Sequence, residues 1–246
     1  MLSNIFNTFF YNPLYNGLVF LISAVPFADV GIAIILLTVL VKLILFPLSR
    51  KAVRTQLVMK KLEPELSVLK EKYKNDKQQQ ARKVMDLYKE KGVNPFSGIL
   101  LMFIQIPIIF ALYWVFFRGG LPEVNESLLY TFVSVPSTVN MIFLGLINMS
   151  GKSVVLAALA GITQYYQIKL TLPPLKNRKD SKDSPTLKED LARSFQLQMR
   201  YMLPVFVLVF SYIISAAVAL YWLTSNIFAI GQEIVVRKRL SKKDTL

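Results

Sequence analysis

Long apolar runs with almost no charge constrain the fold of this chain more than any other feature. Residues 30–48 contain a single charged side chain, Lys42, and residues 97–117 contain none. About 18 consecutive apolar residues are enough to cross the hydrocarbon core of a bilayer. A soluble domain of this length could not bury several such continuous runs in its core. The sequence therefore predicts an all-α integral membrane protein.

The apolar runs predict five transmembrane helices. Single helices are expected at 30–48, 97–117 and 153–172. As one helix, residues 201–236 would extend about 54 Å at about 1.5 Å per residue. The hydrocarbon core is only about 30 Å thick. We therefore expect residues 201–236 to form a hairpin of two short helices that turns near Ser215-Ala216-Ala217.

Two other apolar stretches are interrupted by polar residues and are not counted as spans. Residues 128–150 are uncharged, but Pro136, Asn140 and Asn148 interrupt them. A span there would place two basic loops on opposite sides of the membrane, which the positive-inside tendency disfavours. We therefore expect this stretch to lie at the outer interface, within an outer loop over 118–152.

The N-terminal segment 1–28 has the same character. Asn7, Pro13 and Gly17 interrupt its apolar run, and only a few residues separate it from the first span. An interfacial amphipathic helix fits this segment better than a sixth crossing. Residues 29–246 are then expected to form one core.

The basic residues are concentrated in three segments. Of the 29 lysines and arginines, residues 49–96 hold 13, residues 173–200 hold 7 and residues 237–246 hold 5. Basic loops stay on the cytoplasmic side of a membrane. This pattern predicts an outer N terminus, a cytoplasmic C terminus and a basic tail over 237–246. The placement of the charge also argues against a nucleic-acid partner with a specific sequence.

The first cytoplasmic segment, residues 49–95, is expected to be structured. Apolar residues recur at helical spacing over 50–74 and again over 77–91, with a polar break between them. Two amphipathic helices joined by a short turn make a helical hairpin. The second cytoplasmic loop, 173–200, is polar over 176–190, and we expect that part to be mobile.

The residue inventory excludes several kinds of catalysis. The chain has no histidine and no cysteine, so it lacks a Ser-His dyad, a thiol nucleophile and a histidine-ligated metal. The acidic residues nearest the spans, Asp29 and Glu233, lie at span ends. We find no glycine-rich phosphate loop. We therefore expect neither an enzyme nor a protein that uses a cofactor or metal.

Lys42 is the most informative residue for function. A charged side chain inside a span costs about 2.5–3.5 kcal/mol on insertion scales, so its presence indicates polar surroundings. Other polar and aromatic residues of the spans are expected to line, with Lys42, a water-filled groove open to the cytoplasm. They are Thr38, Gln105, Thr163, Gln164, Gln167, Ser215, Tyr221, Trp222 and Asn226. A cation in such a groove would attract an acidic or polar segment of a passing chain.

Simpler interpretations of these residues stay open. Lys42 lies near the inner end of its span, and its ammonium group can snorkel towards the interface. Gln105 and Thr163 can simply form hydrogen bonds that hold neighbouring helices together. Tyr221 and Trp222 can be an ordinary packing pair, and the basic hairpin can be only a signal for orientation.

Several motifs in this order resemble the YidC family of membrane protein insertases, of the Oxa superfamily. The matching segments cover nearly the whole chain. They are Asn12-Pro13-Leu14-Tyr15-Asn16, residues 38–49 (TVLVKLILFPLS), Leu62-Glu63-Pro64-Glu65-Leu66, Lys70-Glu71-Lys72-Tyr73, Leu87-Tyr88-Lys89-Glu90, Val93-Asn94-Pro95, Ile104-Gln105-Ile106-Pro107-Ile108, Ala111-Leu112-Tyr113-Trp114, and Leu220-Tyr221-Trp222 with Ser225-Asn226.

The resemblance implies a five-helix bundle in the bacterial inner membrane that encloses a hydrophilic groove and uses no cofactor. It implies insertion of nascent membrane proteins from the cytoplasm, with the ribosome and the Sec translocon as partners. It also implies that Lys42 takes the groove's cationic position, where the family usually has Arg. Lysine has the same charge as arginine but lacks the planar guanidinium group with its five N–H donors.

Two other functions are weighed against insertion. A small solute or ion transporter with Lys42 as its site would predict inverted repeats and a pore through the whole membrane. A scaffold would dock ribosomes or Sec components through residues 49–96. Neither accounts for the ordered set of motifs.

Overall fold

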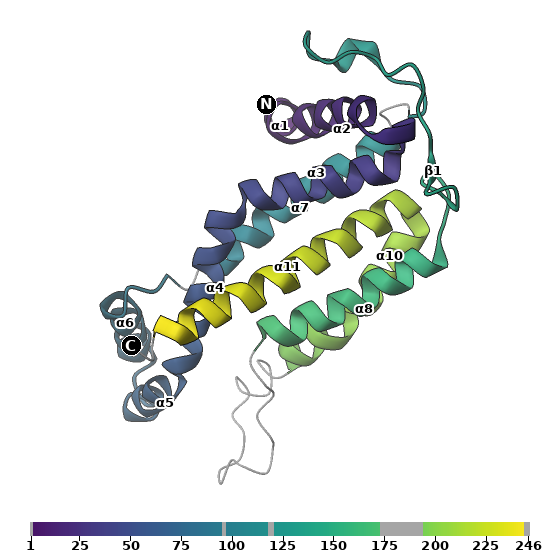
Figure 1. Ribbon diagram of the computed structural model, residues 1–246. Coiled ribbons are helices and arrows are strands. Elements are labelled where there is room, and N and C mark those ends of the chain that lie inside the picture. Colours follow the sequence, from purple (N-terminus) through teal and green to yellow (C-terminus); the bar gives the residue numbers. More distant parts are fainter. Residues whose placement is uncertain (1, 95–96, 118–120, 173–193, 244–246) are drawn as a thin grey trace. The chain divides into compact units, whose positions relative to one another are not determined.

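A computed structural model describes residues 2–94, 97–117, 121–172 and 194–243 (Figure 1). The chain divides into two compact units. Unit 1 comprises Met1–Ile44 with Gln105–Ile230, and unit 2 comprises Leu45–Ile104 with Gly231–Leu246. The described residues are mostly helical, as expected for a helical membrane protein, and each unit is considered by itself.

The N-terminal segment of unit 1 is helical along most of its length. It runs through α1 (Leu2–Phe6), the π-helix η1 (Asn7–Tyr11) and α2 (Asn12–Ala24). Pro13 is accommodated in the first turn of α2, where its missing N–H costs nothing. Leu18, Val19 and Ile22 of α2 are fully buried, and α2 packs against α3 (Val30–Ile44). The segment 1–28 therefore has one apolar face directed at its own protein.

Helix α3 is shorter than the predicted span 30–48, which is a correction. It ends at Ile44, and α4 (Phe46–Lys61) begins after Leu45. Pro47 lies in the first turn of α4. Proline has no N–H to donate to the carbonyl four residues back, and its ring crowds that carbonyl. The chain therefore starts a new helix here.

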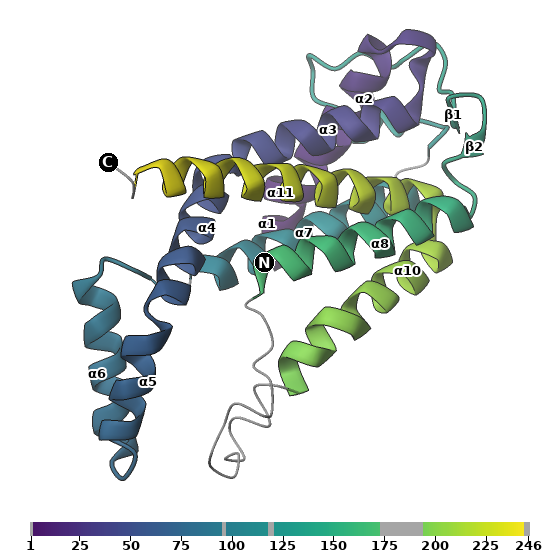
Figure 2. The same cartoon turned by 60° about the horizontal axis from the view of Figure 1, so that its bottom comes forward.

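Helices α8 (Val154–Thr171) and α10 (Leu203–Ile214) pack side by side in unit 1 (Figures 1 and 2). Gly161 permits this approach, because a Cβ added there would lie 3.0 Å from Leu208 Cβ and 3.1 Å from the Pro204 carbonyl oxygen. The π-helix η4 (Gln198–Met202) precedes α10. Helix α7 (Ser97–Phe117) continues through Pro107.

The C-terminal apolar stretch divides at Ser215. This residue has an extended backbone, with φ −169° and ψ 162°, and it separates α10 from α11 (Ala216–Lys243). The break lies where the sequence predicts a turn. Both helices are longer than the short helices expected. Helix α11 has 28 residues, and the continuous helix Ser194–Ile214 has 21. The expected tail 237–246 is also helical up to Lys243, since neither Gly nor Pro follows Gly231 before that point.

The segment 121–152 of unit 1 is irregular apart from three short elements. These are the 3-10 turn η3 (Glu126–Leu128) and the antiparallel strands β1 (Ile142–Phe143) and β2 (Ile147–Asn148). Ile142 pairs with Asn148, and Phe143 pairs with Ile147. Between residues 121 and 152 no helix of spanning length occurs among the described residues.

Backbone hydrogen bonds connect the segment 121–152 to two helix ends. The amide of Val30, at the start of α3, donates to the Asn140 carbonyl at 3.0 Å. The amides of Ala216 and Ala217, at the start of α11, donate to the carbonyls of Gly151 at 2.7 Å and Met149 at 3.1 Å. The segment therefore connects the first residues of α3 to the α10–α11 turn.

Length and hydropathy identify a limited set of candidate spans among the described residues. The helix Ser194–Ile214 qualifies alone, α3 and α4 qualify when taken together, and Phe103–Phe116 is a shorter apolar helix. The predicted total of five spans stays a prediction.

Unit 2 contains a helical hairpin within the range 49–95 where the sequence predicts one. Its helices are α4, α5 (Glu63–Lys72) and α6 (Lys77–Glu90). The first helix predicted at 50–74 is thus two helices, because Pro64 cannot donate a hydrogen bond across the break at Leu62. The Asp76 side chain caps α6 by accepting a 2.9 Å hydrogen bond from the Gln79 amide. The hairpin core consists of Leu62, Leu66 and Leu87 with Val58, Leu69, Val84 and Tyr88 packed around them.

The predicted mobile stretch 176–190 lies outside the described residues.

Candidate functional site

Lys42 is part of a hydrogen-bonded chain of three side chains in unit 1. It lies in the last turn of α3, and its Nζ donates to Gln105 Oε1 of α7 at 3.1 Å. Gln105 Nε2 in turn donates to the Tyr221 hydroxyl of α11. Three helices far apart in the sequence therefore meet at this chain.

The partner of Lys42 is neutral. Across the described residues, no carboxylate forms an ion pair with the Lys42 ammonium group. An amide oxygen satisfies one of the three N–H donors of a lysine but cancels none of its charge. As a residue, Lys42 is partly exposed.

Tyr221 and Trp222 have different surroundings although they are adjacent. Tyr221 is 3% exposed and holds Gln105 through its hydroxyl. The Trp222 ring packs edge-on against Phe210 of α10, with 6.0 Å between ring centroids. Neighbouring residues of a helix point in directions roughly 100° apart. Tyr221 therefore belongs to the Lys42 set, whereas Trp222 contributes to helix packing.

Asn226 and Thr163 form a second polar contact, between α11 and α8. Asn226 Nδ2 donates to Thr163 Oγ1 and to the Ala160 carbonyl, each at 3.3 Å. Asn226 is buried, and a buried amide without partners would carry a desolvation penalty. This contact matches the interpretation of Thr163 as a residue that holds neighbouring helices together.

The other predicted groove residues bond locally. Gln164 Nε2 donates to Gln167 Oε1 at 3.2 Å, and Gln167 Nε2 donates to Thr171 Oγ1 at 3.3 Å, all along α8. The Thr38 hydroxyl donates to the Ile34 carbonyl of its own helix at 2.6 Å. The Ser215 Oγ accepts from the Val218 amide at 3.4 Å and so caps α11. None of these contacts reaches Lys42.

Two polar residues, Asp29 and Gln232, have structural roles that were not predicted from the sequence. Asp29 accepts hydrogen bonds from the amides of Ile32 and Leu144. In unit 2, the buried Gln232 donates to the Ser49 hydroxyl. In the sequence, Gln232 can be recognised in the same way as Asn226, because both are polar residues within an apolar run. Asp29 immediately precedes a predicted helix, which is the position of an N-cap.

The helical hairpin of unit 2 carries mixed charge. Lys91 pairs with Glu65 at 3.5 Å, and Lys74 with Glu71 at 2.7 Å. The hydrogen bond and the charge of Lys74 lower the pKa of the Glu71 carboxyl. Burial in the hairpin core raises the pKa of the Tyr88 hydroxyl.

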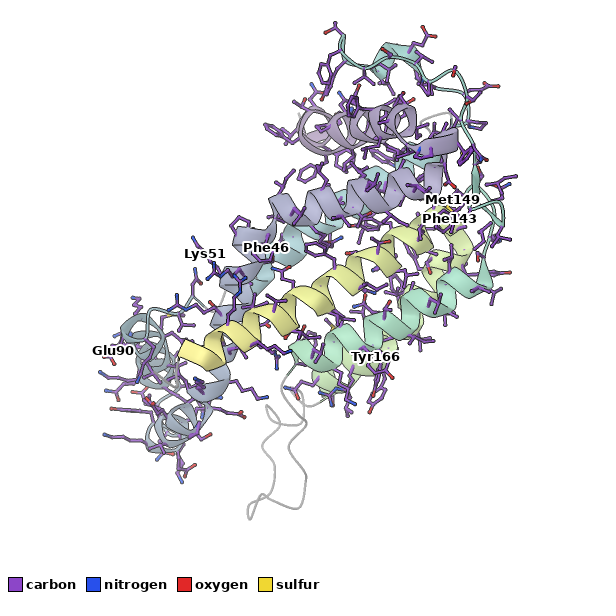
Figure 3. The ribbon with its side chains drawn as sticks, viewed as in Figure 1. Phe46, Lys51, Glu90, Phe143, Met149 and Tyr166 are labelled. Atoms are coloured by element: carbon purple, nitrogen blue, oxygen red, sulfur yellow. The ribbon has the colours of Figure 1, made fainter. Side chains whose placement is uncertain are left out.

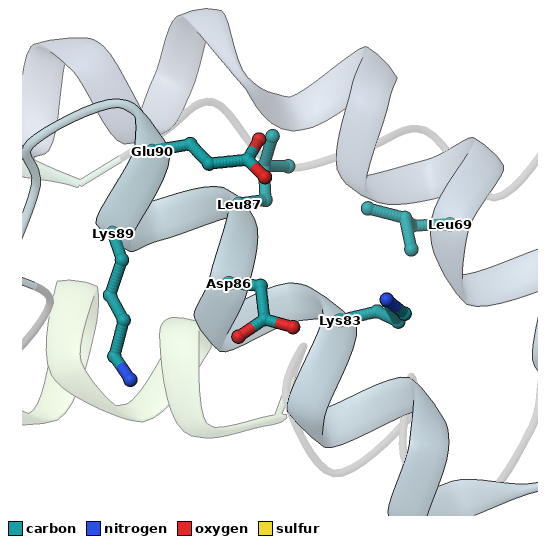
Figure 4. Close-up of a pocket in the computed structure, with 6 residues that line it drawn as sticks. All are labelled: Leu69, Lys83, Asp86, Leu87, Lys89 and Glu90. Carbon is teal, nitrogen blue, oxygen red and sulfur yellow. The ribbon is translucent and has the colours of Figure 1, made fainter.

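A pocket of about 360 Å³ lies on the hairpin (Figure 4). Leu69 and Leu87 give it an apolar base, and two lysines and two carboxylates surround it. These charged residues are Lys83, Asp86, Lys89 and Glu90. With both signs of charge at its rim, the pocket favours neither an anion nor a cation.

Comparison with known proteins settles the family. A sequence model of the family described as 60Kd inner membrane protein matches residues 21–243. The chain belongs to that family. The matched region includes α3, α7, α8 and α11, which carry nine of the ten predicted site residues, and Ser215, which lies between α10 and α11.

Curated relatives of this 60Kd family member carry a common name, membrane protein insertase YidC. The protein of Fusobacterium nucleatum is 33% identical over 234 residues, which is 94% of this chain and 98% of that protein. The protein of Clostridium tetani is 33% identical over 213 residues, or 87% of this chain and 84% of that protein. The resemblance predicted from the motifs is confirmed.

A longer relative shares the same region. The insertase of Francisella tularensis subsp. novicida is 35% identical over 211 residues, which is 85% of this chain but 32% of that protein. The 60Kd family region in this chain therefore corresponds to about a third of the longer protein.

Proposed function

We propose that this membrane protein insertase moves hydrophobic segments of nascent proteins into the bilayer through a polar groove whose cation is Lys42. The observation that carries the proposal is the 3.1 Å hydrogen bond from Lys42 to the neutral Gln105. It fixes the position of a positive charge in an apolar helix without cancelling that charge. The proposed groove comprises Lys42, Thr38, Gln105, Thr163, Gln164, Gln167, Ser215, Tyr221, Trp222 and Asn226.

The proposed topology has five spans, an outer N terminus and a cytoplasmic C terminus. It is supported by the concentration of basic residues in 49–96, 173–200 and 237–246. Residues 1–28 are proposed to lie at the outer interface, ahead of a core over 29–246. In this arrangement, the end of α3 that bears Lys42 is its cytoplasmic end.

The proposed mechanism lowers the cost of moving polar groups into the membrane. A polar or acidic group of the substrate would contact the Lys42 ammonium instead of entering hydrocarbon unpaired, where the cost is several kcal/mol. The apolar face of the same segment would meet lipid. Its burial then drives insertion, at about 25 cal/mol per Å² of apolar surface. No bond is made or broken, so the process needs no catalytic residue.

The cytoplasmic hairpin is proposed to receive the nascent chain near the ribosome. Its helices α5 and α6 enclose a small apolar core, and their outer surface is rich in lysine. The Sec translocon is proposed as a second partner for some substrates. A hairpin-deletion variant with full insertion activity would refute the receiving role.

Complementation of an insertase-depleted bacterium tests the role of Lys42. We expect the wild type and Lys42→Arg to restore insertion of a small two-span substrate, whereas Lys42→Ala and Lys42→Glu fail. Lys169→Ala is the matched control, because Lys169 also lies in the last turn of a unit 1 helix and is exposed. Equal activity of all variants would refute the site but not the insertase function. Failure of the wild type would refute the function itself.

A further inference from the structure

The β1–β2 hairpin ends in an apolar tip. Leu144 and Gly145 form the turn with positive φ values of 51° and 74°. Leu144 is 63% exposed, and Leu146 is 83% exposed. The stretch 128–150 around them carries no charged residue. Two large aliphatic side chains therefore project from a short, neutral hairpin.

Asp29 holds this tip in place. Its Oδ2 accepts a hydrogen bond from the Leu144 amide at 2.8 Å, while its Oδ1 accepts one from the Ile32 amide at 3.1 Å. One buried carboxylate thus binds the hairpin turn to the first turn of α3. Positive φ is unfavourable for a residue such as leucine, and such a conformation persists only where its surroundings enforce it.

Phe143 shows which side of the hairpin faces the protein. A Cβ added to Gly31 of α3 would lie 2.2 Å from Phe143 Cδ2, so the ring lies directly on the helix backbone. Figure 3 labels Phe143 near the buried Met149, on the inner side of this segment. With Phe143 turned inward, the Leu144 and Leu146 side chains are left outside.

Exposed apolar residues also follow the hairpin in the sequence, at the start of a helix. Val154 and Val155 begin α8 a few residues after β2, and both are exposed. Between them and the strand, the Lys152 ammonium lies 5.6 Å from the centre of the Tyr212 ring. Lysine and tyrosine are typical residues of the boundary between membrane and water. Phe27, two residues before Asp29 and just ahead of α3, is 88% exposed.

We propose that Leu144 and Leu146 insert into the outer leaflet, at the boundary between headgroups and acyl chains. The ligand is the lipid surface: no charged side chain in residues 128–150 would have to be desolvated when the tip enters the headgroup region. Asp29 positions the tip through its hydrogen bond to the Leu144 amide. The outer leaflet assignment rests on the proposed orientation, whereas contact with lipid does not.

Site-directed fluorescence tests this contact in purified full-length protein. The chain has no cysteine, so single-cysteine variants can be labelled without background. An environment-sensitive probe is placed at Leu146→Cys, at Glu123→Cys as an exposed polar control of the same segment, and at Leu43→Cys as an apolar span control. The proteins are reconstituted in phosphatidylglycerol–phosphatidylethanolamine vesicles with or without acyl-chain nitroxide lipids.

The expected result is quenching at Leu146 that is several-fold greater than at Glu123 and comparable to that at Leu43. Asp29→Asn, labelled at Leu146, is expected to show weaker quenching, because the neutral amide is a poorer acceptor for the Leu144 amide. Quenching at Leu146 by aqueous iodide, with none by nitroxide lipid, would overturn the proposal. So would protection that appears only when other membrane proteins are added, since that indicates a protein partner.

Orientation and insertion activity are measured separately on the same variants. A membrane-impermeant thiol reagent applied from outside to cells reports the side on which Glu123→Cys lies. Lipid quenching at Leu146 with labelling only from the cytoplasmic side would overturn the outer-leaflet assignment and the proposed topology together. Absence of lipid quenching at Leu146 in a protein that still supports complementation would overturn the proposed lipid contact and leave the proposed function standing.

Discussion

The Lys42 ammonium rests on the side-chain amide of Gln105, 3.1 Å from Oε1. The pairing is asymmetric, since one partner is charged and the other is neutral. A carboxylate at the same position would form an ion pair and would cancel the charge that a substrate is proposed to meet. The identity of residue 105 therefore sets how much of the Lys42 charge is available.

Gln105→Glu is predicted to lower insertion although the side chains are nearly the same size. The new carboxylate would compete with acidic or polar substrate segments for Lys42, because charge-assisted hydrogen bonds are about twice as strong as neutral ones. We expect insertion of a substrate with an acidic translocated segment to fall by about tenfold, which corresponds to about 1.4 kcal/mol. Protease protection of the inserted substrate measures the yield.

The matched control is Gln198→Glu, which makes the same change at an exposed side chain of η4, outside the proposed groove. It is expected to retain near wild-type insertion. Equal losses in the two variants would indicate a general effect of added negative charge, contrary to the prediction.

Tyr221→Phe is predicted to destabilise the protein. The variant removes the hydroxyl that accepts the hydrogen bond from Gln105 Nε2. A fully buried donor without a partner costs about 1–3 kcal/mol; Gln105 is partly buried, so we expect a loss of about 1 kcal/mol. Unfolding in mild detergent with increasing denaturant measures the change. Tyr201→Phe serves as the control, because Tyr201 is exposed, and a comparable loss in that variant would argue against the specific role of the Tyr221 hydroxyl.

Asn226 and Thr163 are predicted to be energetically coupled. Each single variant, Asn226→Ala and Thr163→Ala, breaks the 3.3 Å contact between α11 and α8. Hydrogen bonds between membrane helices average about 0.6 kcal/mol in double-mutant cycles. The double variant should therefore lose less stability than the sum of the two single losses, by about that amount. Strict additivity would show that the contact contributes nothing.

The sequence predicts the apolar helices well, because their signal is local. A run without charge predicts an apolar helix, and the excess length of 201–236 over a bilayer predicts the break at Ser215. Two prolines divide helices that the apolar pattern alone predicts to be continuous. Pro47 ends the helix that contains Lys42, and Pro64 divides the first hairpin helix. In both cases a missing N–H outweighs an apolar or amphipathic pattern that continues across the break.

The candidate site was harder to predict because it depends on contacts between distant residues. The bond between Lys42 and Gln105 spans 63 positions, and nothing in the local pattern indicates that the two side chains meet. Thr38 illustrates the opposite case. Its hydroxyl donates to the carbonyl four residues earlier, as serine and threonine side chains in helices commonly do. A polar residue on the expected face is therefore not always directed at its neighbours.

Gly31→Ala is predicted to be strongly destabilising, and a second substitution should relieve it. The added Cβ would lie within 2.7 Å of three atoms of the Phe143 side chain. Overpacking of this kind costs about 1–3 kcal/mol, so the thermal midpoint in detergent should fall. Shortening the opposing side chain in Gly31→Ala/Phe143→Ala removes the clash and should recover part of the loss. Gly231→Ala is the matched control, because a Cβ there meets no atom within 4 Å and Ala favours a helix. If Phe143→Ala lowers stability equally in the presence and absence of Gly31→Ala, the two residues are not in contact.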